Sequence, residues 1–203
     1  QYSAEEVRAV VEEADRRGVL VAAHAYSPEA ILHSLENGVR SIEHGNLLDA
    51  ATAAAIRDHD AFLVPTLAAY DAMYRRGRDI GMSDVALAKN LEVRDAGLEA
   101  LELARVAGVR LGFGSDLMGP LEDEQLSGLR LQVEVLGVAD ALRSATVGNA
   151  ALLGDAELGR VTVGGPADLL LLPGDPLADP SVLWETRDEP RLVVRAGALH
   201  TGV

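Results

Sequence analysis

The sequence lacks several features that carry chemistry or direct a protein to particular partners. It contains no cysteine, which excludes disulfide scaffolds, cysteine-type zinc sites and thiol nucleophiles. No apolar run approaches the roughly 20 residues that a membrane-spanning helix needs. Acidic residues outnumber basic ones, and the formal net charge of −14 argues against binding to nucleic acid or to an anionic membrane. What remains has the composition of a globular protein, with 48% hydrophobic and 25% charged residues.

Helix and strand signals alternate along the first part of the chain, with short connections between them. Ser3 and Glu6 form a capping box, and Ser27 and Asp49 have the sequence context of helix N-caps. The expected strands are 19–23, 39–43, 61–64 and 109–114. The first of these runs is apolar throughout, which is typical of a strand buried on both faces. The alternation predicts an α/β fold with a parallel sheet, either doubly wound or closed into a TIM barrel.

Two later stretches depart from this rhythm. Residues 67–83 are predicted to form a long loop or irregular helix, after which Asp84 caps a long helix that ends near Gly108. From Leu158 onwards, glycine, proline and short apolar runs predict a small antiparallel sheet. We therefore expect two domains, residues 1–157 and residues 158–203.

Three predicted strands each end on a side chain that can bind a metal. His24 and His44 end neighbouring strands one βα unit apart, and Asp116 ends a later strand. Because the carboxyl ends of barrel strands share one face, these residues predict a single metal site, with Asp116 as ligand and general base. The alternatives are satisfied structural histidines and a turn aspartate. Glu43, which precedes His44, is expected to point to the opposite face.

A basic and aromatic patch follows the third strand. Its members are Tyr70, Arg75, Arg76 and Arg78. One interpretation is a lid or specificity loop whose arginines contact a substrate carboxylate. The other is a solvated insertion, and the sequence does not decide between the two.

Several motifs resemble the second half of the metal-dependent amidohydrolase superfamily, above all its branch of prolidase-like, imidazolonepropionase-related dipeptidases. They are Val21-Ala-Ala-His-Ala-Tyr26, Ser41-Ile-Glu-His-Gly45, Phe62-Leu-Val-Pro-Thr66, Gly112-Phe-Gly-Ser-Asp116 and Ala145-Thr-Val-Gly-Asn-Ala150. The segment from Leu158 to Leu169 is similar to that family's C-terminal segment. The resemblance implies the C-terminal half of a TIM-type (β/α)8 barrel, strands five to eight, plus the C-terminal strands of a small β-sandwich.

The resemblance also implies a chemistry and a ligand set. It implies one or two divalent metals, usually Zn2+, with His24 and His44 as ligands from strands five and six. Asp116 would be the strand-eight ligand that takes a proton from the hydrolytic water, and Tyr26 would hydrogen-bond the developing oxyanion. The implied reaction is hydrolysis of an amide bond in a dipeptide or an N-acyl amino acid.

The sequence departs from the family pattern in two respects. The family also uses a His-x-His pair on strand one and, in binuclear members, a carboxylated lysine on strand four. Neither feature is expected here, because the motifs match only strands five to eight. The single lysine of this sequence is Lys89, on a predicted helix. We therefore expect a truncated chain that is weakly active or inactive alone.

Other functions and the cellular setting stay open at this stage. Ring opening of cyclic amides, deamination on the same scaffold and a non-catalytic half-barrel are the alternative functions. We expect a cytoplasmic protein with a small-molecule or dipeptide substrate and, if it assembles, a homo-oligomer.

Overall fold

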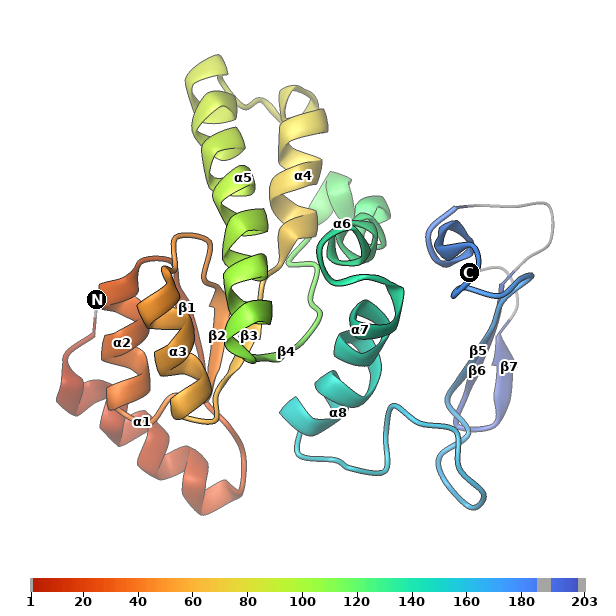
Figure 1. The fold of residues 1–203 in the computed structure, drawn as a ribbon, viewed down its shortest axis with the longest axis horizontal. Helices are drawn as coiled ribbons and strands as arrows, with labels where there is room; N and C mark the ends of the chain where they lie inside the picture. Colours follow the sequence, from red (N-terminus) through yellow and green to blue (C-terminus); the bar gives the residue numbers. More distant parts are fainter. Residues whose placement is uncertain (1, 186–190, 201–203) are drawn as a thin grey trace.

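The computed structural model describes residues 2–185 and 191–200, and a parallel sheet lies at its centre (Figure 1). Its strands are β1 (Ala22–Ala25), β2 (Ser41–His44), β3 (Phe62–Val64) and β4 (Arg110–Leu111). They are paired in the order β1-β2-β3-β4, and each pair is parallel. The predicted α/β class with a parallel sheet is confirmed.

Five helices precede or connect these strands, and all but the fourth begin at a side-chain cap. They are α1 (Ala4–Arg17), α2 (Pro28–Glu36), α3 (Ala50–Asp58), α4 (Leu67–Arg76) and α5 (Asp84–Ala107). Ser3 and Glu6 form the capping box of α1, and the side chains of Ser27 and Asp49 accept backbone hydrogen bonds at the starts of α2 and α3. The cap of α5 is Ser83, one residue before the predicted Asp84.

The main core lies between the sheet and three of its helices. Ile42 and Leu63 of the sheet are fully buried, and they belong to one cluster with Ile31 of α2, Ile56 of α3 and Ala104 of α5. Each fully buried Ile or Leu contributes about 1.5–3 kcal/mol of transfer free energy. This packing fixes the strands, and with them the positions of the residues at the strand ends.

The segment after β3, predicted as a long loop or an irregular helix, is helical: α4 begins at Leu67, and its first six residues are buried. Two other local predictions were wrong. The apolar run 19–23 is not a strand buried on both faces, because β1 begins at Ala22, and Val19 and Leu20 are exposed. Within the last predicted strand, only Arg110 and Leu111 pair with β3.

The rest of the chain forms short helices and a second sheet. The helical segments are η1 (Gly77–Ile80), η2 (Gly119–Glu124), α6 (Ser127–Leu136), α7 (Val138–Arg143), η3 (Ser144–Gly148), α8 (Asn149–Leu152) and η4 (Pro180–Leu183). The antiparallel sheet consists of β5 (Leu169–Leu171), β6 (Leu192–Arg195) and β7 (Ala198–His200). It lies to one side of the parallel sheet in Figure 1, at the end of an extended segment that follows α8. The predicted division at residue 157 stays a prediction.

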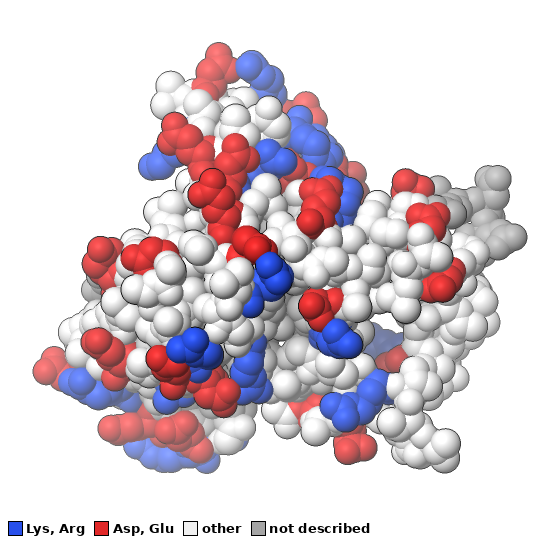
Figure 2. All heavy atoms as spheres, viewed as in Figure 1, with Lys and Arg blue, Asp and Glu red and all other residues white. Residues whose placement is uncertain are grey.

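The surface of one face carries charges of both signs. Figure 2 shows acidic and basic side chains interspersed over this face rather than gathered by sign. Within residues 2–185 and 191–200, every helix is too short or too polar to span a lipid bilayer.

Candidate active site

The two predicted ligand histidines meet at the carboxyl end of the parallel sheet. Nδ1 of His24 lies 2.6 Å from Nε2 of His44. The two rings are stacked, with centroids 4.9 Å apart and an interplanar angle of 26°. His24 is exposed, whereas His44 is buried, so the pair lies at the boundary between the core and solvent.

The backbone of His44 makes this meeting possible. The register pairs His24 with Glu43, and side chains alternate between the two faces of a strand. Regular alternation would therefore place His24 and His44 on opposite faces. His44 has a φ of 76°, in the left-handed region, and this turn brings its ring to His24 at the end of the sheet. The spacing of residues in the sequence does not reveal this turn.

Thr66 is a residue of the candidate site that the sequence interpretation missed. Its Oγ1 lies 2.7 Å from Nδ1 of His44, in a buried position at the end of β3. When Nδ1 of His44 donates its proton to Thr66, Nε2 carries the lone pair and faces His24. Thr66 belongs to the motif Phe62-Leu-Val-Pro-Thr66, so its place after a strand was the available signal.

Two tyrosines cover His44. The ring of Tyr26 stacks on it, with centroids 4.6 Å apart and an interplanar angle of 10°. Tyr70 presents its ring edge to His44 at 6.2 Å and donates a hydrogen bond from its hydroxyl to the Tyr26 hydroxyl, at 3.0 Å. Burial raises the pKa of Tyr70, as do the hydrogen bond to Tyr26 and the charge of Asp116. The Tyr70 hydroxyl therefore stays protonated at physiological pH, and the hydrogen bond that it donates orients Tyr26.

Asp116 lies on the loop that follows β4, and its φ of 52° is also left-handed. It is exposed, and its charge acts on His44. Burial lowers the pKa of His44, and the negative charge of Asp116 opposes that shift. His44 is consequently neutral at physiological pH, which is the form that binds metals.

The interpretation of Glu43 needs correction. We expected it to point away from the site, but its register partner is His24, and residues paired in this way share a face. Burial raises the pKa of Glu43, and a hydrogen bond donated by the Ser41 hydroxyl at 2.6 Å partly offsets that shift. The charges of His24 and Asp116 also act on Glu43, which places its carboxylate beside the site.

The three arginines of the basic patch contact carboxylates of the protein itself. Arg75 pairs with Asp71 and Glu124, and Arg76 pairs with Asp123 and Glu124. The pair between Arg78 and Asp84 joins two exposed side chains. The predicted role of this patch in binding a substrate carboxylate stays a prediction.

The histidine pair fits two ligand positions of a divalent metal. Two imidazole nitrogens converge, and the hydrogen bond between His44 and Thr66 is the kind of contact that orients a metal ligand. In the described part of the chain, no group of three or more His, Asp or Glu side chains is arranged to hold a metal. Two imidazoles have the donor chemistry that zinc accepts, but a zinc site needs further ligands.

Known proteins resemble this chain over nearly its whole length. A prolidase whose crystal structure contains N-methylphosphonate-L-proline is 43% identical to this chain, with a TM-score of 0.93 over 98% of the chain and 49% of the prolidase. The structure of a Xaa-Pro dipeptidase with bound methionine is 29% identical, with a TM-score of 0.85 over 100% of this chain and 50% of the dipeptidase. Ochratoxinase from Aspergillus niger is 28% identical over 92% of this chain and 39% of its own length.

These matches place the chain in a family. It spans about half the length of the prolidase and of the dipeptidase, and less of the ochratoxinase. The sequence profile of the amidohydrolase family matches residues 1–199, which is nearly the whole chain. With prolidase-like structures among its relatives, this chain belongs to the amidohydrolase family.

Proposed function

We propose that this chain provides the His24–His44–Asp116 side of the active site of a metal-dependent dipeptidase that hydrolyses the amide bond before proline. The observation that carries the proposal is the convergence of His24 Nδ1 and His44 Nε2 at 2.6 Å. The 43% identity to a prolidase over 98% of the chain supports the choice of substrate class.

The chain's own residues have distinct roles in this proposal. His24 and His44 hold a divalent cation, for which we propose Zn2+, and Thr66 keeps the ring of His44 in place. Such a cation polarises the scissile carbonyl and lowers the pKa of water. Asp116 accepts the proton of the attacking water, and the Tyr26 hydroxyl donates a hydrogen bond to the oxygen that becomes negative.

The architecture of the complete site is also part of the proposal. We infer that β1 to β4 correspond to strands five to eight of a TIM-type barrel, and that β5 to β7 belong to a small β-sandwich. Since the chain spans about half the length of the prolidase, the remaining metal ligands would come from residues equivalent to the unmatched half. A complete centre would hold one or two cations.

A chimeric enzyme tests this function. This chain replaces the matched half of the 43%-identical prolidase, and the zinc-loaded product is assayed with Xaa-Pro dipeptides and N-acyl amino acids. We expect hydrolysis of Xaa-Pro that falls about 10²–10⁴-fold in Asp116→Asn, the usual contribution of a general base.

The matched control is Asp84→Asn, which neutralises an exposed carboxylate that pairs with Arg78. It should leave kcat and KM unchanged. A folded, zinc-loaded chimera that does not cleave Xaa-Pro, or whose activity survives Asp116→Asn, would overturn the proposal.

A further inference from the structure

The loop that carries Asp116 has no regular structure of its own. Residues 112–118 lie between β4 and η2 and form neither helix nor strand. Asp116 adopts a φ of 52°, which is uncommon for a residue with a side chain, although Asp tolerates it better than most. Contacts from outside the loop therefore have a large part in fixing its conformation.

One side of the loop is fixed by two buried or half-buried amides. The side chain of Asn149 makes two hydrogen bonds of 2.9 Å with the backbone of Phe113: its Oδ1 accepts from the Phe113 N–H, and its Nδ2 donates to the Phe113 carbonyl. The amide of Gln132 donates to the carbonyl of Gly112 at 3.0 Å. These contacts set the backbone that enters the loop before Asp116.

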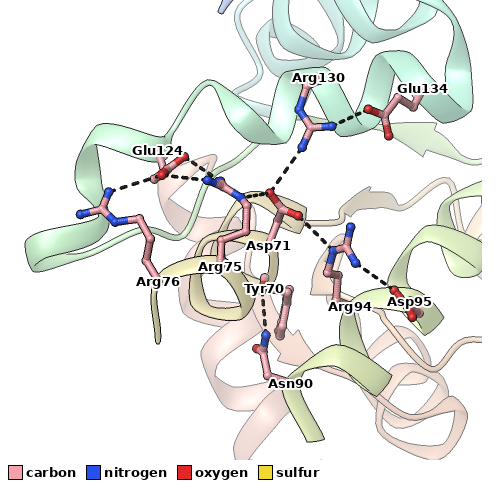
Figure 3. Close-up of polar contacts among 10 residues, drawn as sticks. All are labelled: Tyr70, Asp71, Arg75, Arg76, Asn90, Arg94, Asp95, Glu124, Arg130 and Glu134. Atoms are coloured by element: carbon pink, nitrogen blue, oxygen red, sulfur yellow. Dashed lines mark hydrogen bonds and ion pairs between the residues drawn. The ribbon is translucent and has the colours of Figure 1, made fainter. Parts of the chain in front are cut away.

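The other side of the loop is fixed by two arginines of α4. Arg75 donates two parallel hydrogen bonds to Glu124, at 3.0 and 2.7 Å. Arg76 contacts both carboxylate oxygens of Asp123, at 2.7 and 2.8 Å, and the carbonyl of Pro120, at 3.0 Å. Both arginines therefore bind η2, the segment that directly follows the loop (Figure 3).

Arg75 is itself held by a buried carboxylate. Its Nε donates to Asp71 at 2.9 Å, and the Asp71 side chain is only 3% exposed. Asp71 also accepts from Arg94 of α5 at 3.0 Å and from Arg130 of α6 at 3.4 Å. Figure 3 shows Arg75 between Asp71 and Glu124, so that it joins η2 to the point where three helices meet.

We propose that the Arg75–Glu124 ion pair is a latch that holds the Asp116 loop in its working conformation, which makes Arg75 and Glu124 positioning residues. The inference rests on the proposed role of Asp116 as general base. A guanidinium fork on a carboxylate fixes direction as well as distance, which a single contact does not. Glu124 is 19% exposed, so water competes only partly with Arg75.

The test replaces Glu124 by Gln in this chain, which keeps the side-chain shape and leaves the contact between Arg75 and Asp71 intact. Amide hydrogen exchange across residues 114–124 should become about three- to tenfold faster, as the loop opens more often. The NMR shifts of Asp116 Cα and Cβ, which report its backbone conformation, should move toward values for an ordinary loop. Arg75→Lys, which keeps the charge but loses the fork, should give the same changes in smaller measure.

The control is Arg78→Gln, which removes an ion pair of the same region between exposed side chains, away from η2. It should change neither readout. Unchanged exchange and unchanged Asp116 shifts in a folded Glu124→Gln variant would overturn the latch, and so would equal changes in the control.

These readouts need no turnover, so they separate the latch from the proposed function. In the chimera, Glu124→Gln should lower kcat about tenfold with little change in KM, since the latch acts by positioning Asp116 for the chemical step. If the chimera hydrolyses nothing, the exchange and shift data still decide whether the latch exists. If those data show no latch, the proposed hydrolysis is unaffected and is decided by the chimera assay alone.

Discussion

At the scale of single residues, left-handed backbone is concentrated at the site. Five described non-glycine residues have positive φ, and three of them, His44, Thr66 and Asp116 (76°, 45° and 52°), lie at the carboxyl end of a strand or on the segment that follows it. The other two are Asp60 and Ala196. Such conformations cost on the order of 1–3 kcal/mol each and persist only where the surrounding structure imposes them. For the β-branched Thr66 the conformation is especially unfavourable. Strain placed at three adjoining strand ends is best explained by the need to aim their side chains at one point.

Thr66→Val tests the contact that holds His44. Valine keeps the shape and the backbone strain but removes Oγ1, which leaves Nδ1 of a buried imidazole without this partner. We expect a loss of about 1–3 kcal/mol in the free energy of unfolding, measured by urea denaturation. Any affinity of the chain for Zn2+, measured by calorimetry, should fall about 10–100-fold.

The control for this variant is Thr146→Val. The Thr146 hydroxyl bonds the Leu142 carbonyl on an exposed helical surface, so its loss should cost less than about 0.5 kcal/mol. Equal losses in the two variants would show that the hydroxyl on His44 has no special role.

At the scale of elements, α4 connects the parts of the site. It begins directly after Thr66, carries Tyr70 toward Tyr26, and ends with the arginines that bind η2. The buried carboxylate of Asp71 fixes this helix against α5 and α6 through Arg94 and Arg130. A rotation of α4 would therefore disturb His44, Tyr26 and the Asp116 loop together.

Asp71→Asn tests whether this carboxylate fixes the helix. The variant leaves three arginines around a neutral amide, and their side chains are 22–40% exposed. We expect a loss of roughly 2 kcal/mol in the free energy of unfolding, less than the 3–5 kcal/mol of a fully buried pair because water reaches the arginines.

Asp123→Asn is the matched control on the same group of ion pairs. The Asp123 side chain is 68% exposed, so its pair with Arg76 contributes at most about 1 kcal/mol. If urea unfolding shows Asp71→Asn to be no more destabilising than this control, Asp71 does not fix the helix.

The sequence predicted correctly those features that depend on residues close together in the chain. The caps Ser3, Ser27 and Asp49 act on backbone a few residues away, and they located α1, α2 and α3 correctly. For α4 the sequence left a loop and an irregular helix both open, because the burial of its first half and the carboxylate partners of Arg75 and Arg76 come from distant segments.

The candidate site divides in the same way. Strand ends predicted the meeting of His24 and His44, which the 2.6 Å contact between their nitrogens bears out. The contact of Thr66 with His44 and the face of the sheet on which Glu43 lies depend on strand register and on backbone φ values. The sequence pattern shows neither the register nor the φ values.

At the scale of the whole molecule, the chain joins a largely buried parallel sheet to a largely exposed antiparallel sheet. Residues 153–168 run between them without helix or strand, and nearly all of them are exposed. The C-terminal part nevertheless packs against the helices: Val182 and Leu183 of η4 are 2% and 4% exposed and form one cluster with Leu129 and Ala141. The connection is therefore open to solvent while the contact between the parts is apolar.

Limited proteolysis with trypsin tests this arrangement. Cleavage after Arg160, in the exposed connection, should precede cleavage after Arg57, Arg105 and Arg143, because a protease needs locally extended chain and those three lie in helices. Mass spectrometry of a time course gives the order. Because the cluster around Val182 and Leu183 holds the pieces together, the nicked protein should elute as one species in size-exclusion chromatography and separate only in denaturant. Cleavage in the helices at the same rate would contradict the exposed connection, and separation of the fragments in native buffer would contradict the apolar contact.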